Sequence, residues 1–238
     1  MLITSIGQGL LWAPLAIGVF ITFRILDIPD LTTEGSFPLG AAVTVSAMVS
    51  GQSALVASLL GFLAGCIAGW VTGVLDTKLR MPSLLAGILT MTGLYSVNMH
   101  VMGKSNVPLL NQRVLTSYLP GTWSVDLQTI IVGTIITGVV MVALVWLFKT
   151  RLGLSLMATG NNAAMSAANG IYTDRMVIIG YMVSNGCIAL SGALIAQSNG
   201  YADIGMGIGT IVIDLASVLV GEIFLRGRQI WVRLTAMV

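Results

Sequence analysis

Carboxylates stand out in this sequence because so few of its residues carry charge. Residues 27–42, DIPDLTTEGSFPLGAA, hold three of them, Asp27, Asp30 and Glu34, together with two prolines. Asp214 lies in the middle of another apolar run, TIVIDLAS. Carboxylates can serve as general acids and bases, and inside an apolar structure they mark either a hydrogen-bonding partner or a path for a solute. The elements that carry them decide between these roles.

Other groups that enzymes need are missing from the sequence. There is no Walker-type loop, no H-E-x-x-H motif and no cluster with metal-ligand spacing, and the single histidine is His100. GMGIGT, residues 205–210, lacks the strand and spacing of a phosphate loop, and we interpret it as an outer loop leading into a helix. We therefore expect no catalytic residue, no metal and no cofactor bound by this chain, and no nucleic-acid partner.

Composition places the chain in a lipid bilayer. Hydrophobic residues make up 56% of it and charged residues 8%, whereas a soluble domain has about 25% charged residues. The mean hydropathy is +0.95. The apolar runs are continuous and about twenty residues long, which is typical of membrane-spanning helices. Cys66 and Cys187 both lie inside such runs, and we expect no disulfide between them.

The predicted fold is an all-α, polytopic transmembrane bundle forming one domain over residues 1–238, with seven to eight spans and a short or broken second helix. An eighth helix is expected to begin near residue 230. The other seven are expected at about residues 3–23, 37–50, 53–75, 82–100, 127–148, 176–197 and 208–221.

Lysine and arginine predict the orientation, because cytoplasmic loops are enriched in both. Nine lie at one set of helix ends and two at the other. The smaller set is Lys104 and Arg113. The larger set comprises Arg24, Lys78, Arg80, Lys149, Arg151, Arg175, Arg226, Arg228 and Arg233. The N-terminus is then outside, and the loop 149–174 is cytoplasmic.

The acidic segment before the second helix is expected to dip into the bundle. Pro29 and Pro38 interrupt helices, and Ser36 is a candidate cap for a helix that tolerates Pro38 in its first turn. Irregular backbone at membrane depth must face protein or a watery cavity. Thr33, Glu34 and Ser36 are therefore candidates for a translocation path. The same reasoning turns Asp27, Asp30 and Thr32 toward protein or the path. The alternative places Asp27 and Asp30 in a wet cytoplasmic turn beside Arg24. Arg24, Lys78 and Arg80 are the candidate partners for the acids.

Three further polar residues in apolar helices join the candidate path: Asn98, Asn185 and Asp214. A lipid-facing Asp214 would be too costly. It either makes a buried structural hydrogen bond or lines the path. The two asparagines are candidates for hydrogen bonds between helices as well as for contacts with a solute.

A stripe of glycines, Gly61, Gly65, Gly69 and Gly73, runs along the predicted third helix. One small residue in four leaves a bare groove on one face, and another helix can approach closely there. The stripe predicts helix packing and says nothing about a substrate.

The loop 149–174 is too long for a tight connection, and its middle predicts one short helix. Asn161 or Asn162 can cap the start, and Gly170 can end it in a left-handed conformation. The residues between are small except for Met165. Such a helix fits either a structured loop or a plug for a groove on another protein.

The segment MATGNNAAMSAANGI, residues 157–171, resembles the coupling-helix signature of permease subunits of ABC importers, in the branched-chain amino acid and ribose permease group. DLTTEGSFPLGAA, LRMPSLLAGILTMTGLYS and IVIDLASVLVGE are similar to further motifs of that group, in the same order along the chain. Within the group the resemblance is to permeases assigned to tryptophan and tyrosine.

The resemblance implies an importer of the bacterial inner membrane with two permease copies, two cytoplasmic ATPases that bind ATP and Mg, and an outer substrate-binding protein. It assigns coupling to the ATPase to Gly160, Asn161, Asn162, Met165, Ala168, Gly170 and Ile171. The group usually continues for about two more spans, so the resemblance implies missing C-terminal spans. Asp214 stands where the group usually has a small residue.

Two rival functions remain open. One is a secondary transporter that couples to protons or sodium through Glu34 and Asp214 and needs no ATPase. The other is a membrane-embedded scaffold subunit.

Overall fold

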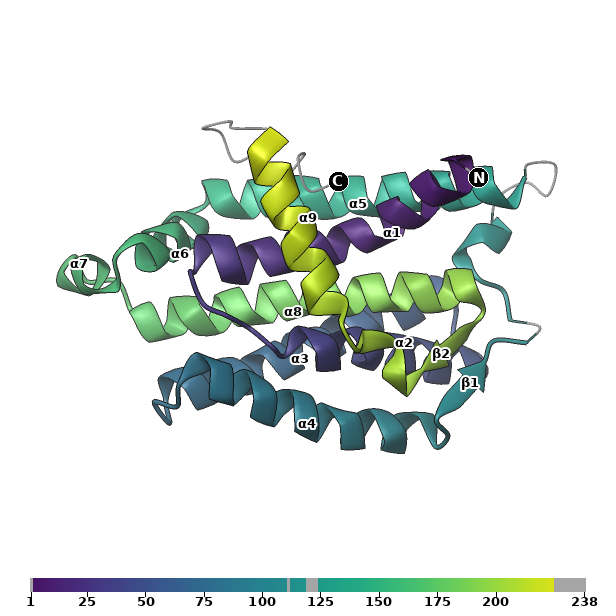
Figure 1. Cartoon of the computed structure of the whole chain (residues 1–238), viewed down its shortest axis with the longest axis horizontal. Helices are drawn as coiled ribbons and strands as arrows, with labels where there is room; N and C mark the ends of the chain where they lie inside the picture. Colours follow the sequence, from purple (N-terminus) through teal and green to yellow (C-terminus); the bar gives the residue numbers. More distant parts are fainter. Residues whose placement is uncertain (1, 111, 119–123, 225–238) are drawn as a thin grey trace.

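The computed structural model describes residues 2–110, 112–118 and 124–224, and it forms a bundle of α-helices (Figure 1). The α-helices of this part of the chain are α1 (Leu2–Phe20), α2 (Thr33–Val49), α3 (Ala54–Thr77), α4 (Ser83–Met102), α5 (Val125–Lys149), α6 (Arg151–Asn161), α7 (Ala163–Ala168), α8 (Thr173–Asn199) and α9 (Thr210–Phe224). Shorter elements are the π-helical turn η1 (Ile21–Ile25), the 3₁₀ turns η2 (Leu115–Tyr118) and η3 (Ile204–Gly207), and the strands β1 (Asn106–Pro108) and β2 (Tyr201–Asp203).

In the part of the chain that the structure describes, six segments are long and apolar enough to cross a membrane, which confirms the predicted polytopic bundle. They are Thr4–Ile25, Ala54–Thr77, Ser83–Met102, Val125–Lys149, Thr173–Asn199 and Ile204–Gly221. The predicted second helix is α2, which is shorter than these. The helix expected from about residue 230 lies outside the described residues, as do three of the nine basic residues assigned to one set of ends.

Helix α8 runs through the centre of the bundle and packs against α1, α2 and α3 (Figure 1). Its buried positions continue along nearly its whole length, from Met176 to Gln197. The outer helices α3, α4 and α5 instead expose large apolar side chains, among them Leu63, Trp70 and Trp146. Apolar atoms on both the inside and the outside are what a bilayer requires of a helical bundle.

The glycine stripe of α3 lies against the centre of the bundle. A Cβ at Gly65 would meet the carbonyl oxygen of Asn185, and one at Gly69 would meet that of Tyr181. A Cβ at Gly73 would lie 2.9 Å from the Cα of Ile178, so these three glycines face α8. Gly61 is turned toward α2, because its Cβ would lie 2.6 Å from the Thr44 hydroxyl. The helices therefore approach backbone to backbone.

The segment 149–174 holds two helices, α6 and α7, where the sequence pattern predicts one. Helix α6 forms because Gly153, Leu156 and Thr159 fall on one buried face with a spacing of three. Its first turn is capped by Thr150, whose hydroxyl accepts from the Gly153 N–H at 3.4 Å. The spacing of these three positions was present in the sequence, with Leu156 as the one large apolar residue among them.

Strands β1 and β2 form a two-stranded antiparallel ladder that no sequence pattern predicts. Asn106 pairs with Asp203, and Pro108 pairs with Tyr201. The ladder joins the long connection between α4 and α5 to the segment that follows α8. It lies at the opposite end of the bundle from α6 and α7 (Figure 1).

We predict that Gly69→Ala lowers the stability of the folded chain, because the new methyl group collides with the backbone of Tyr181. Overpacking of this kind costs about 1–3 kcal/mol. Thermal unfolding of the purified chain in detergent measures the effect. Gly138→Ala on α5 is the matched control, since nothing lies within 4 Å of its added Cβ. Equal melting temperatures for the two variants would contradict the close packing of α3 on α8.

Candidate functional site

The connection between η1 and α2 turns back into the bundle. It runs along the other helices to the start of α2, which lies well inside the molecule (Figure 1). Asp30 and Thr32 in this connection are fully buried. Asp30 contacts Asn185, a residue near the middle of α8. The expected re-entrant segment is therefore present, and α2 begins at about half the height of the central helix.

A hydrogen-bond network fixes this segment to α8. The Asp30 Oδ2 accepts from the Asn185 Nδ2 at 2.8 Å, and its Oδ1 accepts from the Thr32 N–H at 2.8 Å. The Asn185 Oδ1 in turn accepts from the Ser36 hydroxyl at 2.6 Å. No described cation pairs with Asp30, so neutral donors stabilise this buried carboxylate. Ser36 and Asn185, both candidates for the path, are fully buried in this network.

Helix α2 begins at Thr33, and the prediction that Ser36 caps it was wrong. Asp30 takes up the Thr32 N–H, and the Thr33 hydroxyl donates to the Asp30 carbonyl oxygen at 3.2 Å. The backbone is therefore already ordered one turn earlier than Ser36. Pro38 consequently lies inside α2 rather than in its first turn.

Helix α3 contributes two further contacts to the same region. The hydroxyls of Thr32 and Thr72 are 3.0 Å apart. The Tyr181 hydroxyl on α8 donates to the Asp76 Oδ2 at 3.1 Å. The start of α2 is thus held by both of the helices between which it inserts.

The two aspartates of the segment have different environments. Asp30 is buried, whereas Asp27 is exposed and adopts a left-handed conformation with φ 57°. Asp27 fits the alternative of a solvated turn, and Asp30 does not.

A second break in the helices meets the start of α2. Gly207 of η3 packs on the Glu34 carbonyl oxygen, and the Gly209 N–H donates to the Glu34 Oε1 at 3.0 Å. Proline has no N–H, so Pro38 cannot give the Glu34 carbonyl its usual helical hydrogen bond, and this leaves room for Gly207. Gly209 has φ +81°, a conformation that favours glycine. The GMGIGT segment is therefore a bundle contact of Glu34, not only the outer loop that we expected.

A cavity of about 210 Å³ lies where these two breaks face α4. Its lining residues are Glu34, Gly35, Pro38, Met91, Thr92, Tyr95, Asn98, Ile204 and Ile208. Glu34 and Asn98 are thus the two candidate path residues that share a cavity. Broken helices that meet around a site near the middle of the membrane are typical of transporters.

Asn98 is 1% exposed and only half satisfied. Its Nδ2 donates to the Gly35 carbonyl oxygen at 3.2 Å, while its Oδ1 has no partner among the described residues. Buried polar atoms in native proteins are usually hydrogen-bonded. The free oxygen beside the cavity therefore marks a position where a ligand or water is needed.

Asp214 lies elsewhere. It is 3% exposed on α9, which packs against α1, and its Oδ2 has no partner among the described residues. It does not line the cavity of Glu34 and Asn98.

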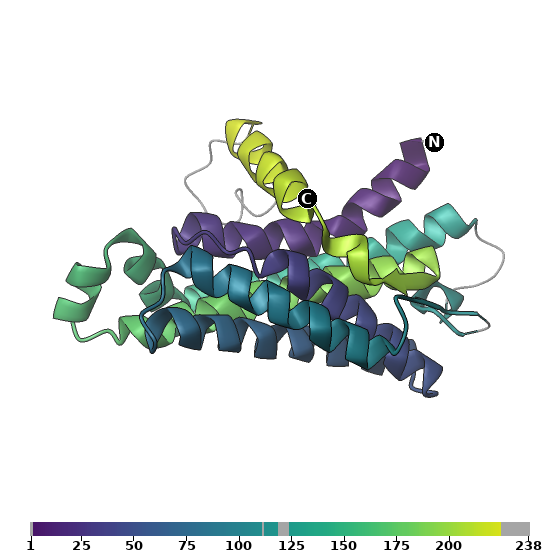
Figure 2. The same ribbon diagram turned by 60° about the horizontal axis from the view of Figure 1, so that its bottom comes forward.

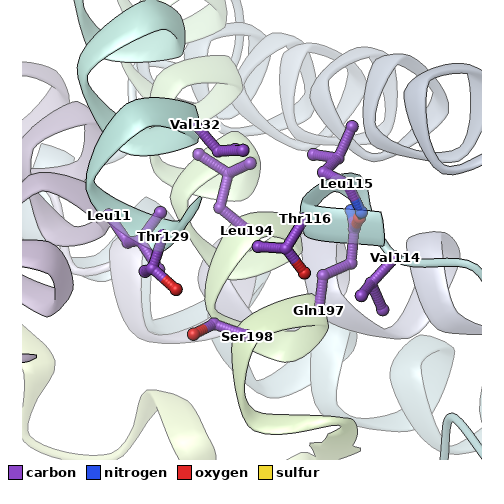
Figure 3. A pocket seen from close by; sticks show the side chains of 9 residues that line it. All are labelled: Leu11, Val114, Leu115, Thr116, Thr129, Val132, Leu194, Gln197 and Ser198. Atoms are coloured by element: carbon purple, nitrogen blue, oxygen red, sulfur yellow. The ribbon is translucent and has the colours of Figure 1, made fainter. Parts of the chain in front are cut away.

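Two other hollows lack the features of a solute site. The pocket in Figure 3 measures about 20 Å³, and its one amide, Gln197, is already bonded to the Leu115 N–H and the Ser58 hydroxyl. Its size suits about one water molecule. A groove of about 520 Å³ between α2, α3 and α4 is lined by apolar residues apart from Thr90, whose hydroxyl donates to the Ala86 carbonyl oxygen.

Helix α7 lies farthest from the body of the bundle in both views (Figure 1 and Figure 2). The Asn162 Oδ1 caps it by accepting from the Met165 N–H at 2.9 Å, and Gly170 ends it with φ +81°. Met165 is 55% exposed. Of the other candidate coupling residues, Asn161 and Ala168 are exposed, Ile171 is half-buried, and Gly160 packs on the Ile25 carbonyl oxygen of η1.

Comparison with known proteins identifies the family. The model of the branched-chain amino acid transport system permease component matches residues 1–237. The chain belongs to this permease family.

Three relatives illustrate the range of the family. The chain is 40% identical to a tyrosine transport system permease protein of Clostridioides difficile, over 92% of its own length and 72% of the relative. It is 37% identical to an uncharacterised protein of Rickettsia prowazekii, over 94% of its own length and 78% of that protein. It is 30% identical to the autoinducer 2 import system permease protein LsrC of Yersinia pestis, over 90% of its own length and 59% of that protein. No solved structure matches the chain significantly.

Family membership and the six apolar spans make the chain a multi-pass membrane protein and the permease component of a transport system. Relatives of this permease are named as transport components rather than as enzymes. Within the described residues, no group of three or more His, Cys, Asp or Glu side chains is arranged to hold a metal ion.

We predict that Asn185→Leu destabilises the permease, because it leaves the Asp30 Oδ2 and the Ser36 hydroxyl without their partner. An unsatisfied buried group costs about 1–3 kcal/mol, and more when it is charged. Thermal unfolding in detergent measures this loss. The exchange Asp30→Asn with Asn185→Asp restores an amide–carboxylate pair and should recover part of the stability. An exchange no better than Asn185→Leu would show that the pair does not hold the segment.

Proposed function

We propose that this chain is the transmembrane permease subunit of an ATP-driven importer of the bacterial inner membrane. Its solute is a small molecule of the amino-acid class, with aromatic amino acids among the candidates, that a substrate-binding protein delivers from outside. ATP and Mg bind to a separate cytoplasmic ATPase, and two permease copies form the path. Family membership and the relative named for tyrosine transport support this proposal.

The observation that carries the coupling proposal is the position and build of α7. It is a capped helix of small residues at the far end of the bundle (Figure 1). The apolar side chain of Met165 is exposed on it. A short, smooth helix with a single apolar knob has the shape to fit a groove on a second protein. We assign this groove to the ATPase.

The described contacts connect α7 to the candidate path. The preceding helix α6 packs on η1 through Gly160 and the Ile25 carbonyl oxygen, and η1 leads into the re-entrant segment. The chain after α7 continues directly into α8, which carries Asn185. A displacement of α7 by ATP-driven closure of the ATPases would therefore reach the Asp30–Asn185 contact from two sides, as alternating access requires.

The distribution of basic residues supports the orientation. Six of the nine residues of the larger set lie at the ends of η1, α3, α5, α6 and α8 on the α7 side of the bundle (Figure 1). They are Arg24, Lys78, Arg80, Lys149, Arg151 and Arg175. Lys104 and Arg113 lie in the connection that carries β1. The positive-inside rule then makes the α7 end cytoplasmic and the N-terminus external.

We predict that Met165→Asp abolishes co-purification of the ATPase, because a carboxylate cannot enter an apolar groove without a large desolvation cost. The tagged permease is solubilised from host membranes, captured, and its partners are identified by mass spectrometry. Membrane insertion and melting temperature should be unchanged, since Met165 is exposed.

Leu110→Asp is the matched control, because Leu110 is an exposed apolar residue of the connection that carries β1. ATPase recovery with Met165→Asp equal to that with Leu110→Asp would rule out coupling through α7. Recovery of a well-folded wild-type chain without any ATPase would instead favour an ion-coupled secondary transporter.

A further inference from the structure

The polar atoms that line the cavity between α2, α4 and η3 are mostly hydrogen-bond acceptors. Glu34 contributes a carboxylate, of which Oε1 accepts from the Gly209 N–H and Oε2 has no described partner. Asn98 contributes the unpartnered Oδ1. The Thr92 hydroxyl donates its hydrogen bond to the Ile88 carbonyl oxygen at 2.8 Å, so only its oxygen is free to accept. Of the lining side chains, Tyr95 and the amide of Asn98 carry the other donors, and that amide is engaged.

The orientation of the Asn98 amide follows from its neighbour. Its nitrogen faces the Gly35 carbonyl oxygen at 3.2 Å. Turning the amide over would bring two oxygen atoms together, which gains no hydrogen bond. The arrangement thus keeps an acceptor, and not a donor, free at a site where Asn98 is 1% exposed.

The remaining lining is apolar or aromatic: Pro38, Met91, Tyr95, Ile204 and Ile208. Ca²⁺ and Mg²⁺ are a poor fit to this lining, because Ca²⁺ takes six to eight oxygen ligands and Mg²⁺ takes an octahedral set. A primary ammonium group needs only three acceptors. The cavity volume of about 210 Å³ is below the roughly 300–1,000 Å³ of pockets for drug-sized ligands, so it suits a solute of about the size of an amino acid.

We propose that this cavity is an ammonium-binding subsite in which the Glu34 carboxylate and the Asn98 Oδ1 hold the –NH₃⁺ group of a small solute with an apolar or aromatic body. The proposal deepens the proposed function, on which it rests for the class of solute. The bond to Glu34 is charge-assisted and carries most of the recognition. Asn98 positions the group and excludes analogues that lack it.

The test measures protection of a cysteine in the cavity wall. Thr92→Cys is placed in a full-length chain whose native thiols are removed by Cys66→Ala and Cys187→Ala, because Thr92 is exposed and lines the cavity. The purified chain is alkylated with iodoacetamide in the presence of tyramine, or of 4-ethylphenol, which has the same body without the ammonium group. We expect tyramine to slow alkylation at least fivefold at saturation and 4-ethylphenol to have no such effect.

Two further substitutions in this background define the site. Glu34→Gln should raise the half-protective concentration of tyramine about tenfold or more, as the loss of a hydrogen bond to a charged group predicts. Asn98→Leu should raise it by a smaller factor. Asp27→Asn is the matched control, since Asp27 is an exposed carboxylate outside the cavity and should leave protection unchanged. Melting temperatures establish that each variant is folded.

The possible results separate cleanly. Equal protection of the introduced cysteine by both compounds, or protection by neither, overturns the subsite. A folded Glu34→Gln variant with an unchanged half-protective concentration of tyramine also overturns it. Should Glu34→Gln fail to fold, the comparison of tyramine with 4-ethylphenol on the parent chain still decides.

Uptake of labelled L-tyrosine into vesicles, with the ATPase and binding protein present, tests the proposed function separately. Protection by tyramine without ATP-driven uptake would leave the subsite standing and remove the importer. ATP-driven uptake that is unaffected by Glu34→Gln, with no protection by tyramine, would leave the importer standing and remove the subsite.

Discussion

The hydrogen bond between Asp30 and Asn185 is the contact on which the arrangement around the cavity depends. It holds an irregular, acidic segment at half the height of the central helix, where lipid would make such a backbone prohibitively costly. Because Asp30 is fixed there, α2 starts inside the bundle, and Glu34 comes to lie opposite η3 and α4. The close approach of α3 to α8 through Gly65 and Gly69 supports the contact from behind, since bulkier residues would push the helices apart.

Local patterns in the sequence were enough to predict the positions of the helices. Within the described residues, each of the seven expected apolar runs forms a helix within a few residues of the expected limits, because hydrocarbon allows few other solutions for a continuous apolar segment. The caps of α7 were also predictable, since Asn162 and Gly170 act on neighbours a few residues away. The start of α2 was misplaced because Asp30, not Ser36, begins the ordered backbone there.

The candidate site was predictable only in part, because its contacts join residues that lie far apart in the chain. Glu34 and Asn98 were recognised as polar residues in an apolar setting, but nothing local indicated that they share one cavity. Gly209, 175 residues after Glu34, became visible as its partner only in the folded chain. Thr33, Ser36 and Asn185 carry the same polar signal in sequence, yet they are buried in hydrogen bonds rather than placed in the cavity wall. Polarity in an apolar run thus identifies residues that need partners, without saying whether the partner is protein or solute.

The small ladder of β1 and β2 makes the connection between α4 and α5 and the segment after α8 a single mechanical unit. The Leu109 N–H donates to the Gly200 carbonyl oxygen at 2.7 Å, and the Ile204 N–H donates to the Ser105 carbonyl oxygen at 3.1 Å. Ile204 is also part of the cavity wall. A molecule that displaces the 105–109 segment therefore also displaces η3, because the strand pair connects the two. The part of the cavity wall that faces Glu34 moves with η3.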